Sequence, residues 1–384
     1  MITLCGGQAP GQGYRIEDAM SHDKARAAAR TRMAETGEPY AAARRTVIGE
    51  YQAPRGQSLP GPHPGYLITL VGSGSGAGAG VPGAAVRDAM SGRVVDRLPG
   101  RMDVYSAVAG TGGGRVFFLA RRFGRERMAD SDPAAGQMPP GGAVCVQIDD
   151  GGKVADLSAV PGVPEPARLG PIHLAASADG GRLAYPVRRD RGGPPAANAP
   201  PSEISIVAVA TGERTVWQAE SDGDISDVSL SADGRRLAYS WHGAGEGNGI
   251  RVTDLPDTAP GGVVTTPSRL VIPEQNSLGN LGQAVVSSDG ARLYVTAARY
   301  GAGGQPVTRL AEISVADGQV RRIAYERRGA DYGNVIFGWG PLVIDSSGQH
   351  ALIAYGGNLG RIELSTGHFT ELPMDENGAF DIAW

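Results

Sequence analysis

A short turn sequence that recurs at nearly even spacing most constrains the fold of this chain of 384 residues. Its first three copies read Ser-x-Asp-Gly-x-Arg-Leu, and the turn glycines of the four copies lie 54, 56 and 58 residues apart. Asp-Gly between two apolar runs is a strong hairpin signal, because glycine adopts the positive φ of the turn without steric cost. Such regular self-similarity indicates one supersecondary unit that completes its core against its neighbours. The copies are Ser177–Tyr185, Ser231–Tyr239, Ser287–Val295 and, weakened, Ser346–Ile353.

A second turn recurs inside the same units. An apolar alternation leads into Thr-Gly, Ser-Gly or Asp-Gly, and a second alternation follows. Alternation with a period of two marks strands with one buried face, and the glycine marks the turn that joins them. The two turns together divide each unit into four antiparallel strands, a to d, which form the blade of a β-propeller. The second turns lie at Ser91-Gly92, Thr211-Gly212, Asp317-Gly318, Thr366-Gly367 and, less regularly, Asp149–Gly151.

The repeats predict five complete blades and one divided blade. Before the first complete unit lies a fragment with three strands, over residues 66–71, 85–89 and 93–98. The apolar alternation of Ala379–Trp384 has no partner after it, so we expect it to supply strand a of that first blade and to hide an exposed sheet edge. The predicted fold class is all-β, a six-bladed β-propeller of four-stranded antiparallel blades with 3+1 ring closure, preceded by a short α-helical N-terminal segment. The complete units lie near 102–160, 171–220, 225–272, 283–325 and 335–373.

The first part of the chain differs from the repeats. We expect a disordered start and a short helical hairpin over residues 1–51, with Ser21 as the N-cap of the first helix and Gly37 as its end. Residues 52–65 are rich in proline and glycine and predict a linker. The propeller then occupies residues 66–384.

Composition narrows the possible functions. The net charge of −4 argues against a dedicated nucleic-acid binder. No apolar run approaches the roughly 20 residues that cross a bilayer, and the first residues lack the basic stretch and apolar core of a secretory signal. Cys5 and Cys145 match no metal or redox spacing and suit a reducing compartment. We therefore expect a cytoplasmic protein without a membrane segment.

Motifs that could carry catalysis are better explained in other ways. Gly72–Gly80 imitates the glycine pattern of a dinucleotide-binding turn, with Asp96 downstream. However, Val86–Val95 has the Ser-Gly hairpin of the later units, so the glycine-rich stretch is better explained as a loop. No serine has the flanking glycines of a nucleophile elbow, and the six histidines are scattered without metal-ligand spacing. We expect no catalytic, cofactor-binding or metal-binding residues and no cofactor.

The loops between strands b and c carry the candidate binding residues. Because every unit threads in the same way, these loops should lie on one face of the ring. They bring arginine and aromatic side chains to one rim, and such residues are enriched where proteins bind partners. Acidic residues in the same loops leave an ordinary solvated face as the alternative. The candidate partner-binding residues are Arg121, Arg122, Arg188, Arg189, Trp241, His242, Arg299 and Tyr300.

The Ser-x-Asp-Gly-x-Arg-Leu-Ala-Tyr unit, as in Ser231–Tyr239, resembles the repeats of TolB-like and WD40-like bacterial β-propellers. The resemblance covers about residues 65–384, although the chain lacks the Gly-His and Trp-Asp dipeptides of true WD40 blades. It implies a six-bladed ring that binds another protein. TolB-like members are usually exported, which the start of this chain does not support.

The expected function is a non-enzymatic, protein-binding scaffold that uses its b–c loop face. Two alternatives remain open: a propeller enzyme of the lactonase or lyase type, and a sensor of a small ligand or peptide. Either would place its site at the mouth of the central channel. A lactonase-like or lyase-like site needs carboxylates, asparagine or histidine around a metal, whereas these loops carry arginines. The sequence indicates neither the partner nor the oligomeric state.

Overall fold

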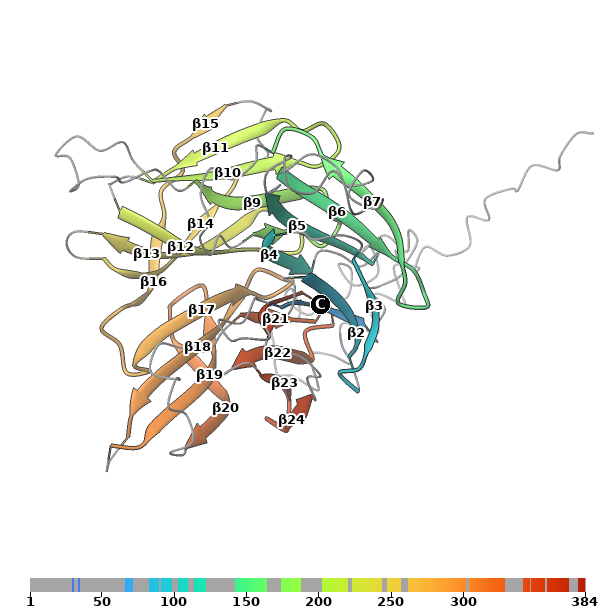
Figure 1. Ribbon diagram of the computed structural model, residues 1–384. Helices are drawn as coiled ribbons and strands as arrows, with labels where there is room; N and C mark the ends of the chain where they lie inside the picture. Colours follow the sequence, from blue (N-terminus) through green and yellow to red (C-terminus); the bar gives the residue numbers. More distant parts are fainter. Residues whose placement is uncertain are drawn as a thin grey trace, which may run out of the picture. The chain divides into compact units, whose positions relative to one another are not determined.

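The structure is a computed structural model of the whole chain (Figure 1), in which two compact units are distinguished, Met1–Ser58 and Leu59–Trp384. In the first unit only Arg30 and Ala34 are described, and both are helical. The rest of the predicted helical hairpin and the predicted linker lie outside the described residues. The structure describes residues 30, 34, 66–71, 83–89, 91–98, 103–109, 114–121, 142–163, 174–187, 202–219, 223–243, 247–256, 262–301, 304–328, 341–345, 347–355, 358–372 and 379–383.

The described residues of the second unit form strands and turns, without a helix. The strands belong to six sheets, which we number as blades 1 to 6 along the chain. From the innermost strand outward, blade 1 contains β25 (Ala379–Ala383), β1 (Tyr66–Val71), β2 (Gly83–Asp88) and β3 (Val94–Arg97). Blade 2 contains β4 (Asp103–Ala109), β5 (Arg115–Arg121), β6 (Gly142–Ile148) and β7 (Val154–Val160). Blade 3 contains β8 (Ala175–Ala176), β9 (Arg182–Val187), β10 (Glu203–Ala208), β11 (Arg214–Gln218) and β15 (Val263–Val264).

The last three blades follow the same plan. Blade 4 contains β12 (Gly223–Leu230), β13 (Arg236–Gly243), β14 (Gly249–Asp254) and β16 (Arg269–Pro273). Blade 5 contains β17 (Asn280–Val286), β18 (Arg292–Tyr300), β19 (Pro306–Ser314) and β20 (Val320–Arg328). Blade 6 contains β21 (Leu342–Ile344), β22 (His350–Tyr355), β23 (Asn358–Glu363) and β24 (Phe369–Leu372).

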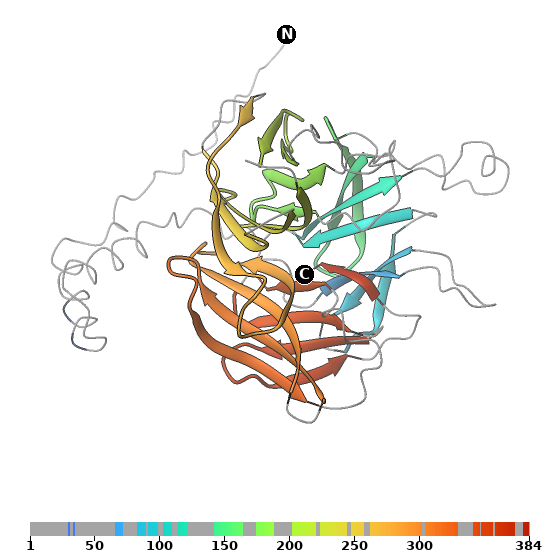
Figure 2. The same cartoon turned by 90° about the vertical axis from the view of Figure 1, so that its left-hand side faces the viewer.

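The innermost strands of the six blades contact one another in a closed cycle, in the order β25, β4, β8, β12, β17 and β21. Figure 2 shows the sheets arranged around a common centre, in colour order from blue through green and yellow to red. The second unit is therefore a six-bladed β-propeller of antiparallel blades, as the repeats predict. The unit predicted near 225–272, for example, corresponds to β12, β13, β14 and β16. In blade 1, β25 pairs antiparallel with β1, with Thr69 opposite Ile382.

Apolar side chains are buried between neighbouring blades, in one cluster for each of the six interfaces. Val86 and Phe118 meet between blades 1 and 2, and Leu352 and Ile382 meet between blades 6 and 1. The sequence patterns predicted one buried face per strand, but the central residues of β9 and β10 are all buried. The reason is that each blade packs against a neighbour on either side. Outer strands such as β7 and β20 stay largely exposed.

Blade 3 has a fifth strand that the sequence patterns do not predict. β15 comes from the connection between β14 and β16 of blade 4 and pairs in parallel with β11, with Val216 opposite Val263. Nearby, Trp217 is fully buried, and its indole Nε1 donates to Thr266 Oγ1 at 3.1 Å. This pairing has two residues and no hairpin turn of its own, so neither periodicity nor turn chemistry reveals it.

Candidate functional site

The strands of every blade end at two opposite faces of the ring. One face, which we call the turn face, contains the turns between the first two strands of blades 2 to 6. It also contains the turns between the last two main strands of each blade. The connections between the second and third strands, and from one blade to the next, lie on the other face, which we call the loop face. A candidate site belongs on the face whose polar side chains are not already engaged in holding the fold together.

On the turn face, each Ser-x-Asp-Gly turn is closed by its own side chains. Ser231 Oγ donates to Asp233 Oδ1 at 2.6 Å and accepts from the backbone amide of Arg236 at 2.9 Å. Asp233 Oδ1 also accepts from the backbone amide two residues later at 3.0 Å. The hydrogen bond from Ser231 is the largest influence on the pKa of Asp233 and lowers it. The turns that begin at Ser177 and Ser287 have the same bonds.

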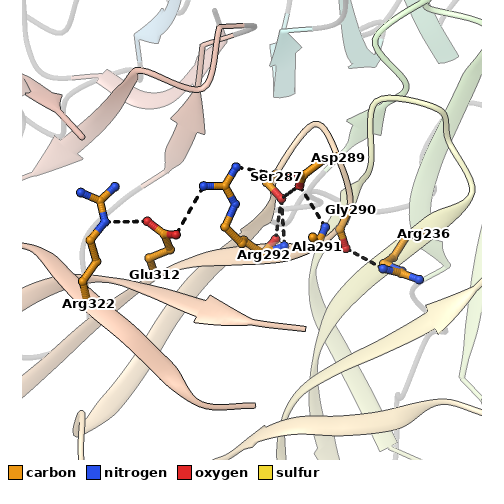
Figure 3. A network of polar contacts seen from close by, with 8 residues as sticks. All are labelled: Arg236, Ser287, Asp289, Gly290, Ala291, Arg292, Glu312 and Arg322. Atoms are coloured by element: carbon orange, nitrogen blue, oxygen red, sulfur yellow. Dashed lines mark hydrogen bonds and ion pairs between the residues drawn. The ribbon is translucent and has the colours of Figure 1, made fainter. Parts of the chain in front are cut away.

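In blades 3 and 4, the arginine of this motif joins its own turn to the turn of the following blade. Arg182 of blade 3 donates from Nη1 to the carbonyl oxygen of Gly234 in blade 4 at 3.1 Å. Arg236 of blade 4 donates in the same way to Gly290 in blade 5 at 2.7 Å, as Figure 3 shows. Hydrogen bonds with a charged donor are roughly twice as strong as neutral ones. The motif is therefore a connector between blades as well as a hairpin turn.

In blade 5 the motif arginine has different partners. Arg292, the equivalent arginine, contacts Glu312 at 3.4 Å instead of the next turn glycine. Glu312 also accepts from Arg322 Nε at 2.7 Å, and Arg322 Nη1 donates to the carbonyl oxygen of Leu364 in blade 6 at 2.7 Å. Figure 3 shows the carboxylate of Glu312 between the two guanidinium groups. The largely buried carboxylate of Glu312 thus binds two arginines. The charged side chains of this turn are therefore engaged in contacts within blade 5 and between blades 5 and 6.

Four of the predicted loop-face residues cannot be placed fully. Arg121 is the last residue of β5, opposite Asp103 in the register. Its side chain lies outside what the structure describes, as do Arg122, Arg188 and Arg189. The partner-binding role of these four residues stays a prediction.

Blade 4 carries two of the predicted residues at the loop end of β13. Trp241 is only 5% exposed and belongs to the core between blades 3 and 4. A Cβ atom at Gly223 would lie 2.3 Å from its ring, so the glycine makes room for the indole. The next residue, His242, is exposed, and its Nε2 lies 3.4 Å from Ser226 Oγ. Alternation along the strand thus directs the tryptophan into the core and the histidine to the surface.

Blade 5 carries the other two at the loop end of β18. Arg299 and Tyr300 are both exposed, the tyrosine to 59%. Arg299 Nη1 lies 3.4 Å from the carbonyl oxygen of Ser277, in the loop that leads into β17. Asn276 fixes that loop, because its Nδ2 donates to the carbonyl oxygen of Pro273 at 2.8 Å. Arg299 and Tyr300 are thus both exposed at the same strand end, although alternation along β18 directs their side chains to opposite sides of the sheet.

Three charged residues of the neighbouring strands extend this edge of blade 5. In the register, Arg299 lies opposite Val307 and Val307 opposite Arg328. Two residues along, Arg309 lies opposite Glu326, whose carboxylate accepts from Arg309 Nε and Arg328 Nε, each at 2.7 Å. None of these three residues lies in a loop between strands b and c. The sequence could have indicated them, because the third strand of a blade begins on the loop face and the fourth strand ends there. We call Arg299, Tyr300, Arg309, Glu326 and Arg328 the blade-5 tip.

Two observations on the described residues concern metal ligands and thiol reactivity. None of their His, Cys, Asp and Glu side chains form a group of three or more that could hold a metal ion. Burial raises the pKa of the half-buried Cys145 thiol, which disfavours the reactive thiolate. In the same part of the chain, no helix is long and apolar enough to span a bilayer.

Comparison with known proteins bears on the fold. No protein-family model matches the chain, and no curated protein matches it in sequence. Among solved structures, it is similar to TolB from Acinetobacter baumannii, with a TM-score of 0.55 and 14% identity, over 89% of this chain and 71% of that chain. A structure described as a complex of KlAtg21 with the coiled-coil of AgAtg16 has a TM-score of 0.43 and 13% identity, over 81% of this chain and 79% of that chain. The first similarity shows that the propeller is TolB-like in fold.

Proposed function

We propose that this protein is a non-enzymatic scaffold that binds another protein through the loop face of its propeller. A six-bladed β-propeller is typical of protein-binding scaffolds, because a rigid ring of blades presents its loops together on one side. The observation that carries the proposal is the exposure of both Arg299 and Tyr300 at the loop end of β18. Tyrosine and arginine are enriched at protein interfaces and among the residues that dominate binding energy.

The contrast between the two faces supports the choice of the loop face. On the turn face, Arg182, Arg236 and Arg322 donate to carbonyl groups of the next blade. A partner that competed for these arginines would break bonds that hold the ring together. On the loop face, a partner can cover Tyr300 and Arg299 without separating two blades.

The proposal includes three further points about the whole chain. The pairing of β25 with β1 acts as a 3+1 closure of the ring, which keeps the frame of the loop face rigid. Residues 1–51 serve as a helical adaptor joined to the propeller by the linker at 52–65. The protein works in the cytoplasm, where its two cysteines stay reduced.

Affinity purification of the tagged full-length chain from its native cells tests the proposal. We compare the unchanged protein with Tyr300→Ala and with Val263→Ala, a control with similar exposure on the outer strand of blade 3. The proposal predicts a specific partner whose recovery, by quantitative mass spectrometry, falls about tenfold with Tyr300→Ala, which corresponds to roughly 1.4 kcal/mol. Recovery should be unchanged with Val263→Ala. Equal recovery with both variants contradicts the proposal, provided that their thermal unfolding matches that of the unchanged protein.

A further inference from the structure

We infer that the blade-5 tip binds an acidic segment of the partner protein, an extended stretch rich in aspartate and glutamate. The inference rests on the proposed function and specifies the chemistry of the partner. It is carried by the placement of three arginines, two of which share the carboxylate of Glu326, at the loop end of β18, β19 and β20.

Two arginines of the tip lie on the same side of the sheet. Residues directly opposite each other in an antiparallel pair point to the same side, and Arg299, Val307 and Arg328 form one such row across three strands. Neighbouring strands are about 4.8 Å apart, so the Cα atoms of the two arginines are separated by roughly 10 Å. An extended segment advances about 3.3 Å per residue. Two acidic residues separated by two or three positions therefore match this spacing.

The charges of the tip do not cancel. Glu326 is the one carboxylate among the five tip residues, and it accepts hydrogen bonds from Arg309 and Arg328. The hydrogen bond from Arg328, followed by that from Arg309, holds the pKa of Glu326 below its usual range, so this carboxylate stays ionised at neutral pH. The five tip residues therefore carry three positive charges and one negative charge. The Arg328 side chain is 70% exposed, so a carboxylate of the partner can approach it from solvent.

A protein segment explains the tip better than a nucleic acid does. Nucleic-acid binders neutralise many phosphates with an extended basic surface. Here the chain as a whole carries a net charge of −4, and the tip interleaves its arginines with Glu326. Tyr300 follows Arg299 in β18 and points to the other side of the sheet, so its exposed ring is available to a segment that passes over the strand end. We expect a segment in which acidic residues flank an apolar or aromatic one.

Fluorescence anisotropy with the full-length chain tests this inference. The probes are a labelled peptide of about 12 residues in which Asp and Glu flank a phenylalanine, the same peptide with Lys for each acid, and a single-stranded oligonucleotide. The acidic peptide should bind, and more weakly as salt rises, because salt screens surface charges. The double variant Arg299→Glu/Arg328→Glu should weaken this binding at least about tenfold, or roughly 1.4 kcal/mol. Arg321→Glu, at the turn end of the same strand β20, should leave the affinity within about twofold.

Each contrary outcome has a definite meaning. Failure of the acidic peptide to bind, or equal binding by the double variant, overturns the inference. So does tighter binding of the oligonucleotide that depends on the same two arginines. If the native partner is lost with Tyr300→Ala but kept by the double variant, the proposed function stands and the acidic segment is wrong. If both variants keep every partner, the proposed function fails as well.

Discussion

Arg236 donates from Nη1 to the carbonyl oxygen of Gly290 at 2.7 Å, across the boundary between two blades. The Nε atom of the same arginine contacts Asp254 Oδ1 in its own blade, also at 2.7 Å. One side chain thus contacts both the sheet that carries it and the turn of the following sheet. The repeated motif therefore helps to set the arrangement of blades in addition to the shape of each hairpin.

We predict that Arg236→Ala lowers the free energy of unfolding by about 1–3 kcal/mol, because a charged hydrogen bond to a turn carbonyl is lost. The contact with Asp254 adds little, since that carboxylate is 74% exposed. Urea unfolding followed by tryptophan fluorescence measures the change. In the control Arg321→Ala, whose partner Asp317 is also on the surface, the change should stay below about 0.5 kcal/mol. Equal stability of the two variants would mean that the connection between the turns contributes nothing.

Alanine substitutions at two turn glycines allow the cost of a strained backbone to be distinguished from the cost of a steric clash. Gly318 and Gly348 have φ values of 70° and 67°, so alanine is strained at both, by about 1–2 kcal/mol. A Cβ atom at Gly318 would also lie 2.4 Å from the carbonyl oxygen of Val271 in blade 4, whereas one at Gly348 meets nothing within 4 Å. We predict that Gly318→Ala destabilises the protein by about 1–3 kcal/mol more than Gly348→Ala. Equal losses in urea unfolding would contradict a close contact between blades at Gly318.

Stability should depend on pH through Asp233. Its pKa is lowered in the folded protein from an ordinary value near 3.8, chiefly by the hydrogen bond from Ser231. A lowered folded pKa contributes stability above the unfolded value, and this contribution is lost as pH falls through the folded value. The unchanged protein should therefore be more stable than Asp233→Asn at pH 7, and the difference should shrink below about pH 4. Urea unfolding of both proteins at several pH values checks this, and a difference that is constant with pH would refute it.

The C-terminal strand should be essential to stability. Ile382 of β25 is fully buried in the cluster between blades 6 and 1. Truncation of such a side chain leaves a cavity, so Ile382→Ala should cost about 2–4 kcal/mol. Ile323, on the outer strand β20, is 38% exposed, and Ile323→Ala should cost about 1 kcal/mol or less. A loss with Ile382→Ala no larger than with the control would also count against closure of the ring by β25.

The fold could be predicted because its turns depend on local chemistry. Gly234 and Gly290 have the positive φ that an Asp-Gly turn implies, and their spacing marks the blades. In blade 6, matching the sequence to the Ser-x-Asp-Gly motif was less informative about the turn. Asp345 takes the place of the motif serine: its Oδ1 accepts from the amide of His350 at 2.9 Å, as Ser287 Oγ accepts from the corresponding amide in blade 5 at 3.0 Å. A hydroxyl and a carboxylate can exchange roles, which residue matching does not detect.

The candidate site was less predictable than the fold, because exposure and proximity depend on neighbouring strands and blades. Trp241 stands near a strand end, as Tyr300 does, yet it is buried against the preceding blade. Arg328 joins Arg299 only through the register of three strands. Neither relationship can be derived from loop composition.

Site-specific photo-crosslinking tests the central claim most directly. A photoreactive residue replaces Tyr300 or His242 on the loop face in the full-length protein, and Arg93, which is exposed in the turn between β2 and β3, serves as the control on the turn face. After irradiation in native cells, crosslinked products are identified by mass spectrometry. The account predicts the same partner from positions 300 and 242 and none from position 93. Crosslinking of that partner from position 93, with none from the loop face, would contradict it.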